Sequence, residues 1–179
     1  MSTLLKFMEK VAEHLEKFKR ELDLESVEKA INLINSAERI FVIGSGRSGL
    51  IAKAFAMRLM HLGYKTYVVG ETITPKIKEK DLLVAVSGSG ETSYTVDYAR
   101  KVKEFGVKVL SFTGKKESTL SSLSDVVVEL RWKEKKDKIF PLGTLFEITA
   151  MVFLDALVSE IMVRKSIDEK EMEDRHALE

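Results

Sequence analysis

The first part of the chain carries apolar residues at the spacing of amphipathic helices. Between residues 4 and 22 they recur at steps of three and four, which predicts a helix of about five turns with one apolar stripe. The stripe consists of Leu4, Met8, Val11, Leu15, Phe18 and Leu22. A second helix is expected over about residues 25–37, so we predict an N-terminal helical segment over about residues 1–37.

Short runs of β-branched and other apolar residues follow, and they alternate with helical stretches. The runs lie at residues 40–43, 66–69, 82–86, 107–112 and 126–130. Each run is continuous instead of alternating, which is typical of strands in a parallel sheet that helices cover on both faces. Helices are predicted over residues 48–62 and 92–105, each ended by a glycine, and a long final helix over residues 145–165.

The order of these elements predicts a fold class. Strand, helix and strand in repetition give a doubly wound α/β domain, here a three-layer αβα sandwich with a five-stranded parallel sheet of the flavodoxin or Rossmann type. The 179 residues suffice for one domain, so residues 1–179 are interpreted as a single unit. The polar stretch at residues 131–141 is interpreted as a solvated loop.

Composition and charge exclude several classes of function. The 29 Lys and Arg balance 28 Asp and Glu, so the net charge of +1 gives no reason to expect nucleic-acid or membrane binding. Cysteine is absent, which excludes disulfides, thiolate metal sites and a cysteine nucleophile. We find no leader or membrane-spanning pattern and expect a cytoplasmic protein, and 32% charged residues without Gln are typical of thermophilic proteins.

A first glycine-rich turn follows the run at residues 40–43 and opens a helix. Residues 44–49 read Gly-Ser-Gly-Arg-Ser-Gly, which fits the G-x-G-x-x-G pattern of dinucleotide sites. Glu71 lies about 20 residues further on, at the end of the next run, where such a site places the acid that binds the ribose. A small nicotinamide-dependent reductase is therefore one hypothesis.

A second turn lies in the same kind of place, after the run at residues 82–86. Its residues are Ser87, Gly88, Ser89, Gly90, Glu91 and Thr92. Glycines let backbone N–H groups approach an anion, and hydroxyls add donors, although Ser and Thr also serve as plain helix caps. Because a dinucleotide would leave this turn unexplained, the two turns together favour a small phosphorylated metabolite. We expect the Glu91 side chain to point to solvent.

These turns and three further segments resemble a known family. The further segments are Met-Arg-Leu-Met-His-Leu-Gly at 57–63, Val-Gly-Glu-Thr at 69–72 and Pro-Leu-Gly-Thr-Leu-Phe-Glu at 141–147. In order, over about residues 40–176, they resemble the archaeal 6-phospho-3-hexuloisomerase family of SIS (sugar isomerase) domains. The resemblance implies interconversion of D-arabino-hex-3-ulose 6-phosphate and D-fructose 6-phosphate, the isomerase step of the ribulose monophosphate pathway.

The resemblance also implies roles for residues around the two turns. Moving the carbonyl needs a base for the C2 proton, a stabilised enediolate and return of the proton to C3, without a metal or redox cofactor. Glu147 is then the base, Arg47 stabilises the enediolate or orients the sugar, and Ser48 and residues 87–92 bind the substrate. The alternatives are a T-x-x-E capping box from Thr144 to Glu147, a surface ion pair for Arg47 and a helix cap for Ser48.

The three histidines receive different interpretations. His14 is placed on the polar side of the first helix and is interpreted as solvated. His61 lies near the end of the helix that follows the first turn, where a structural role competes with a catalytic one. His176 resembles a C-terminal histidine of the family that assists ring opening or proton transfer, across a subunit boundary in one interpretation.

The family resemblance further implies partners. It implies a homo-oligomer, either a dimer or a homotetramer, with sites near subunit boundaries, and hexulose-phosphate synthase as functional partner. The apolar positions around the helix at residues 148–163 agree with burial on more than one side. Two alternatives within the same fold are a SIS module that binds a sugar phosphate and regulates a partner without turnover, and an isomerase of another sugar phosphate.

Overall fold

Five parallel strands form the centre of the computed structural model, which describes residues 2–132 and 139–176. The strands are β1 (Ile40–Gly44), β2 (Thr66–Val68), β3 (Leu82–Ser87), β4 (Lys108–Thr113) and β5 (Val126–Glu129). Their order across the sheet is β2-β1-β3-β4-β5, and every neighbouring pair is parallel. The predicted five-stranded parallel sheet is confirmed.

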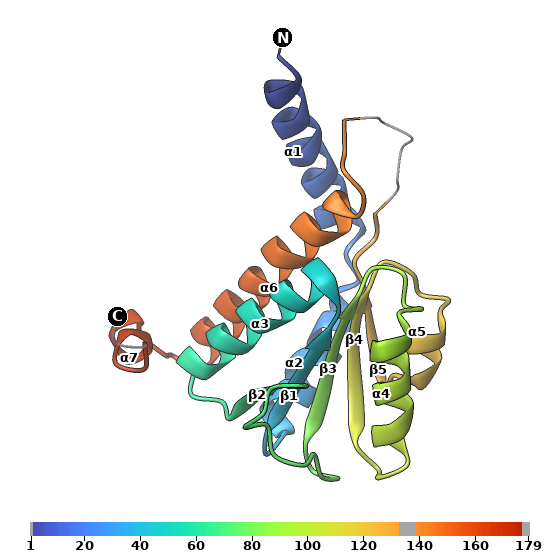
Figure 1. The fold of residues 1–179 in the computed structure, drawn as a ribbon. Coiled ribbons are helices and arrows are strands. Elements are labelled where there is room, and N and C mark those ends of the chain that lie inside the picture. Colours follow the sequence, from blue (N-terminus) through green and yellow to red (C-terminus); the bar gives the residue numbers. More distant parts are fainter. Residues whose placement is uncertain (1, 133–138, 177–179) are drawn as a thin grey trace.

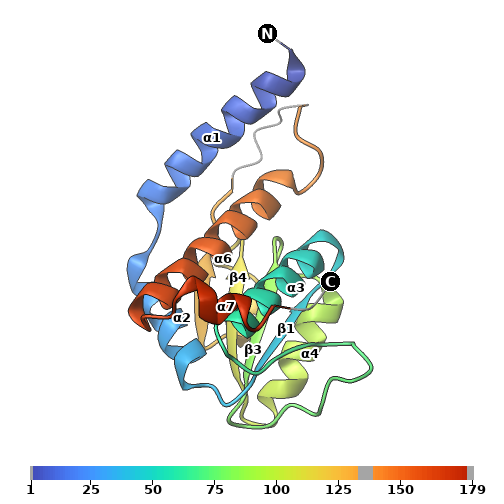
Figure 2. The same cartoon turned by 90° about the vertical axis from the view of Figure 1, so that its left-hand side faces the viewer.

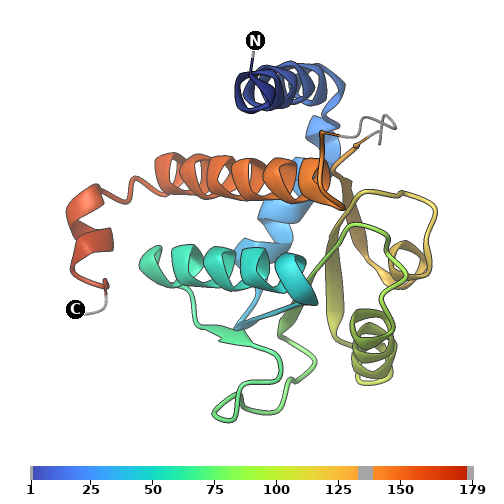
Figure 3. The ribbon, with the colours of Figure 1, turned by 45° about the horizontal axis from the view of Figure 1, so that its top comes forward.

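Helices cover both faces of this sheet. They are α1 (Thr3–Glu21), α2 (Leu24–Ser36), α3 (Gly46–His61), α4 (Ser93–Lys103), α5 (Thr119–Leu123), α6 (Thr144–Arg164) and α7 (Glu169–Glu173). Figure 1 shows α2, α3 and α6 on one face and α4 and α5 on the other, which is the predicted three-layer sandwich. Helices α3 and α6 run side by side (Figure 3). No helix in the described part of the chain is long and apolar enough to cross a bilayer.

Successive side chains of each strand point to opposite faces and build two separate cores. In β3, Leu82, Val84 and Val86 pack in the core with α2, α3 and α6, whereas Leu83 and Ala85 pack in the core with α4. Every residue of β3 is buried. Burial on both faces explains why the sequence of this strand is a continuous apolar run. The same packing fixes the position of the carboxyl end of β3, where the second glycine turn begins.

Some boundaries and short elements differ from the predicted ones. α3 begins at Gly46 instead of residue 48, and α4 begins at Ser93. The pattern of apolar residues did not reveal α5 and α7, because five residues are too few to display a helical repeat. Within the stretch predicted as a solvated loop, residues 133–138 lie outside the described residues.

The first half of α1 extends beyond the rest of the molecule (Figures 1 and 2). Near its other end Phe18 is buried and meets Phe153 of α6 edge to face, with ring centroids 6.0 Å apart. Leu4 and Met8 belong to the same predicted stripe but are 66% and 60% exposed. Within this chain the stripe is therefore buried only where α1 crosses α6.

A buried acid at the amino edge of the sheet is fully paired. Asp81 directly precedes β3 and accepts hydrogen bonds from Arg39 Nε at 2.9 Å and Arg39 Nη2 at 2.6 Å. The backbone amide of Lys78 donates a third bond at 2.6 Å. Because its charge is matched and its oxygens are bonded, Asp81 joins the β1 and β3 starts without an uncompensated buried charge.

A second acid at the same edge is paired in the same way. Asp125 directly precedes β5 and accepts bonds from Lys103 Nζ at 2.8 Å, Lys108 Nζ at 3.0 Å and the Val109 amide at 2.8 Å. Burial alone would raise the pKa of the Asp125 carboxyl, but these bonds outweigh burial and hold the pKa below its usual value. The ionised carboxylate therefore stabilises the folded edge.

Candidate active site

Two neighbouring strands lead into helices on opposite faces of the sheet. β1 leads into α3, whereas its neighbour β3 leads into α4 on the other face (Figure 1). The loops after such strands diverge and leave a crevice at the carboxyl edge, which is where open α/β sheets bind ligands. Both predicted turns lie at this edge: residues 44–49 run from the end of β1 into the first turn of α3, and residues 87–92 run from the end of β3 to the start of α4.

The turn at residues 87–92, which we call the serine-glycine loop, brings its hydroxyl groups together. Ser87 Oγ accepts a bond from the Gly90 amide at 3.2 Å and lies 3.3 Å from Thr92 Oγ1. Ser89 Oγ accepts a bond from the Glu91 amide at 3.2 Å. Hydroxyl donors and an adjoining helix start are therefore concentrated over one short stretch of backbone, as an anion site requires.

Three helices begin around this crevice without a side-chain cap. Within the described residues, Thr92 before α4, Ser45 before α3 and Gly143 before α6 make no side-chain bond to the first helical turn. The other helices, α1, α2, α5 and α7, are capped by Ser2, Asp23, Ser118 and Asp168. First-turn amides without a cap are donors at the positive end of a helix, which suits a negatively charged ligand.

This geometry removes the capping alternatives for the predicted site residues. Ser48 does not cap α3, because the N-cap is Ser45 and Ser48 already lies in the first turn. The capping box from Thr144 to Glu147 is not formed either, because α6 has Gly143 as its N-cap, with a positive φ of 79°. The Glu147 carboxylate is therefore available for another role.

Glu147 and Arg47 meet across the crevice, from the first turns of α6 and α3. Arg47 Nε lies 2.5 Å from Glu147 Oε2, and the two side chains are 64% and 12% exposed. The contact is an ion pair without hydrogen-bond geometry, and Oε2 is a buried oxygen that has no hydrogen-bond partner among the described residues. Because the Arg47 charge compensates this carboxylate without fixing it by a hydrogen bond, Glu147 is a candidate for a functional group.

The start of α6 also contacts the serine-glycine loop. A Cβ atom at Gly88 would lie 2.9 Å from Cδ1 of the buried Phe146, so a larger residue would push α6 away from the loop. Gly90 has a positive φ of 67°, and a Cβ there would collide with the Ser118 side chain. The loop and the first turns of α3 and α6 thus form one site.

Two acids near this site are engaged elsewhere. Glu91 is exposed, as expected, and its Oε1 accepts a bond from the Thr119 amide at 2.8 Å, at the start of α5, so the side chain points away from the loop interior. This bond, with a contribution from Lys115, lowers the pKa of the Glu91 carboxyl. Glu71, the candidate ribose acid, forms an exposed ion pair with Lys53 Nζ at 2.6 Å.

The predicted histidines lie at the other end of α3. The rings of His61 and His176 are 5.0 Å apart between centroids, and His61 is buried. Burial lowers the pKa of His61, as do the nearby His176 and Arg58. From Arg47 to His61 the helix rises about 21 Å, at roughly 1.5 Å per residue. Within one chain, the structure therefore separates the histidine pair from Glu147 and the serine-glycine loop.

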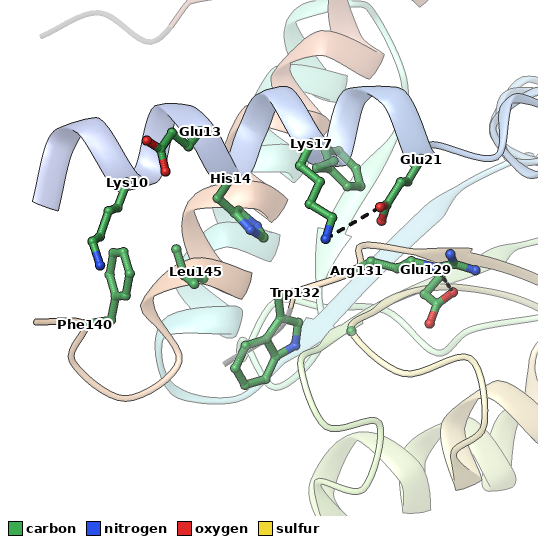
Figure 4. Close-up of a pocket in the computed structure, with 12 residues that line it drawn as sticks. Lys10, Glu13, His14, Lys17, Glu21, Glu129, Arg131, Trp132, Phe140 and Leu145 are labelled. Carbon is green, nitrogen blue, oxygen red and sulfur yellow. Dashed lines mark hydrogen bonds and ion pairs between the residues drawn. The ribbon is translucent and has the colours of Figure 1, made fainter. Parts of the chain in front are cut away.

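A cavity of about 580 Å³ lies beside the site, between α1, the end of β5 and the start of α6 (Figure 4). His14 lines it, and its Nε2 lies 2.9 Å from Thr149 Oγ1 of α6, so its predicted place on a solvated helix face is wrong. Trp132 lines the same cavity and packs directly on Gly114. Sequence reasoning missed this cavity, because its walls come from segments far apart in the chain.

Comparison with known proteins relates this geometry to a family. The family described as SIS domain matches residues 33–159. A protein of Methanocaldococcus jannaschii named 3-hexulose-6-phosphate isomerase is 42% identical over 150 residues, which cover 84% of this chain and 82% of that protein. This chain belongs to the SIS domain family. The resemblance seen in the sequence motifs is thereby confirmed.

Two further relatives show the range of the SIS family. A solved structure from Methanococcus jannaschii, described as inferring a molecular function of 3-hexulose-6-phosphate isomerase, is 36% identical with a TM-score of 0.90 and covers 97% of this chain and 98% of that one. A Thermotoga maritima protein named an uncharacterized HTH-type transcriptional regulator is 31% identical over 148 residues, which are 80% of this chain but 52% of that protein.

Proposed function

We propose that this protein is a 6-phospho-3-hexuloisomerase, which interconverts D-arabino-hex-3-ulose 6-phosphate and D-fructose 6-phosphate through an enediolate. The observation that carries the proposal is the buried Oε2 of Glu147, which faces Arg47 without a hydrogen bond from the described residues, beside a serine-glycine loop that opens an uncapped helix. The serine-glycine loop suits a phosphate, and the Glu147 carboxylate suits proton transfer. The relatives that carry this name support the choice of substrate.

In this proposal the serine-glycine loop binds the phosphate. Ser87, Ser89 and Thr92 offer hydroxyl donors, and the backbone amides of Gly88 and the first turn of α4 add to them. The Gly90 amide, which donates to Ser87 Oγ in this structure, turns to the phosphate when the ligand binds. Ser48, in the first turn of α3, binds a sugar hydroxyl. Binding the phosphate at α4 directs the sugar carbons across the crevice toward α3 and α6, which start on the other face of the sheet.

Glu147 then acts as the base. Its carboxylate removes the C2 proton of the 3-ketose, and the electrons move onto the C3 oxygen to give an enediolate. The C2 hydroxyl proton passes to the C3 oxygen, and the same carboxyl returns the carbon-bound proton to C3, which leaves the carbonyl at C2. Arg47, already 2.5 Å from Glu147, is placed to stabilise the negative enediolate oxygens. The steps need only groups that this chain supplies.

His61 and His176 act in the site of a second copy in this proposal, because α3 separates them from Glu147 of their own chain. Exposed apolar side chains on α1 and α6 support a homo-oligomer: Leu4, Leu5, Met8, Met151, Val152 and Val163. Two inactive variants, Glu147→Gln and His176→Ala, should regain activity when they are mixed and reassembled. Failure to regain activity would remove the shared site from the proposal.

A coupled assay tests the activity itself. Hexulose-phosphate synthase makes the 3-ketose from formaldehyde and ribulose 5-phosphate, and fructose 6-phosphate is then followed through a coupled dehydrogenase. We expect product only when this protein is added. Sugar-phosphate binding without any product would instead favour a regulatory module, as the relative named a transcriptional regulator suggests. Product from an arabinose or heptulose phosphate alone would favour a different sugar-phosphate isomerase.

A further inference from the structure

The serine-glycine loop is held from behind by residues 114–120, which we call the brace segment. Three hydrogen bonds join them, and in each the brace segment donates and the loop accepts. They run from Gly114 N to Gly88 O at 3.2 Å, from Leu120 N to Gly90 O at 3.0 Å and from Thr119 N to Glu91 Oε1 at 2.8 Å. Glu91 is the loop residue that contributes a side chain to this set.

These bonds set the direction of the loop's backbone dipoles. A carbonyl oxygen that faces a phosphate repels it, whereas an N–H group attracts it. Because the carbonyls of Gly88 and Gly90 accept bonds from the brace segment, they point away from the crevice. The N–H group of each of these peptides points the opposite way from its carbonyl; these are the amides of Ser89 and Glu91, and the Glu91 amide donates to Ser89 Oγ within the loop. The brace segment thus prepares the loop before a ligand arrives.

The brace segment is itself fixed on its other side. Gly114 packs under the Trp132 ring, where any side chain would collide with the indole. Trp132 is a wall of the cavity in Figure 4. Ser118 caps α5 through a bond from the Ser121 amide at 3.2 Å and also lies against Gly90. The loop therefore rests on a packed support and not on a free segment.

Glu91 is otherwise difficult to explain in a loop that binds phosphate. A carboxylate close to a phosphate dianion repels it and lowers the affinity of the loop for phosphate, so charge alone disfavours an acid at this position. We infer that Glu91 is a positioning residue of the phosphate site, whose carboxylate holds the loop against the Thr119 amide. The inference rests on the proposed phosphate ligand but not on the proposed turnover.

Three variants separate the bond from the charge. Glu91→Gln removes the charge but keeps a carbonyl oxygen that can accept from Thr119, whereas Glu91→Ala removes both. Glu117→Ala is the matched control, because Glu117 is an exposed acid of the brace segment that forms no bond or ion pair within the described residues. Calorimetry with inorganic phosphate and with fructose 6-phosphate measures the affinity of each variant.

A positioning role for Glu91 and simple charge repulsion predict opposite changes in phosphate affinity when Glu91 is replaced by Ala. With a positioning role, Glu91→Ala weakens the binding of both ligands about tenfold, while Glu91→Gln and Glu117→Ala bind as the wild type does or more tightly. KM for the sugar phosphate rises in Glu91→Ala, with kcat nearly unchanged. If Glu91→Ala binds phosphate as tightly as the wild type or more tightly, the inference is wrong.

A measurement without ligand separates this inference from the proposed function. Amide hydrogen exchange of the ligand-free protein should become faster in peptides that cover residues 87–92 and 114–120 in Glu91→Ala, but not in Glu91→Gln or Glu117→Ala. Unchanged exchange in Glu91→Ala would overturn the positioning role even in an active isomerase. The wild-type protein could also fail to turn over hexulose phosphate while Glu91→Ala still shows faster exchange and weaker phosphate binding. That result would support the positioning role of Glu91 and contradict the proposed function.

Discussion

At the amino edge of the sheet, Asp81 and Asp125 each accept three hydrogen bonds, whereas at the carboxyl edge a buried oxygen of Glu147 has the Arg47 ion pair but no hydrogen bond from the described residues. The helix starts show the same contrast: α3, α4 and α6 begin at the crevice without a side-chain cap from the described residues, whereas the other helices are capped. Groups that satisfy one another contribute to stability. Uncapped amides and a carboxylate without hydrogen bonds are available to a ligand in a crevice, and this contrast supports the proposed site.

The largest expected effect is on the Glu147 carboxylate. Glu147→Gln keeps the size of the side chain but cannot take a proton, so kcat should fall about 10²- to 10⁴-fold. Affinity for fructose 6-phosphate, measured by calorimetry, should stay within a few-fold, because the proposed phosphate contacts lie on the loop. Glu160→Gln, on the same helix but paired with Arg164, is the control and should keep full activity. An active Glu147→Gln enzyme would contradict the assignment of the base.

Substitutions at the amino edge of the sheet should lower the stability of the protein and leave its phosphate affinity unchanged. Asp81→Ala leaves Arg39 without its partner at a largely buried position, and we expect the free energy of unfolding to fall by about 3 kcal/mol or more. Urea denaturation measures this loss, and Asp81→Asn serves as a milder variant if the first does not fold. Phosphate affinity of the folded fraction should be unchanged. Weaker binding would show that the two edges are coupled.

A pair of helix-start variants sharpens the comparison. Asp23→Ala removes a cap that bonds the Glu25 and Ser26 amides, so stability should fall by about 1 kcal/mol with no change in phosphate affinity. Thr92→Val removes a hydroxyl that caps nothing in the described chain, so stability should change little while phosphate affinity falls about tenfold. The reverse pattern would make Thr92 an ordinary cap and remove it from the site.

The smallest effect is a pH dependence at the amino edge. The pKa of Asp125 is lower in the folded chain than the value of about 3.9 expected when it is unfolded, so its contribution is present above that pH and is lost as the pH falls through the folded value. Asp125→Asn should therefore be less stable than the wild type by about 1 kcal/mol at pH 7. Below about pH 4 the difference should shrink. If the stability difference between the wild type and Asp125→Asn stays constant with pH, the charge of the Asp125 carboxylate is not its cause.

Local patterns in the sequence were enough to predict the sheet, because a strand such as β3 is buried on both faces and leaves a continuous apolar run. They also placed both glycine turns at the carboxyl edge, since parallel strands all end there. The Arg47–Glu147 contact joins residues 100 positions apart, and His14 meets Thr149 across a similar separation. Such contacts depend on how α1 and α3 pack against α6, and local periodicity carries no information about that packing.

The positions of Gly114 and Trp132 have an optical consequence. Trp132 is the one tryptophan among the 179 residues, and it packs on Gly114, whose amide is bonded to Gly88 of the serine-glycine loop. Indole emission responds to the polarity and packing around the ring. A change in the loop reaches this ring through a single glycine, so the chain carries its own fluorescent probe of the loop, and no dye or label has to be attached.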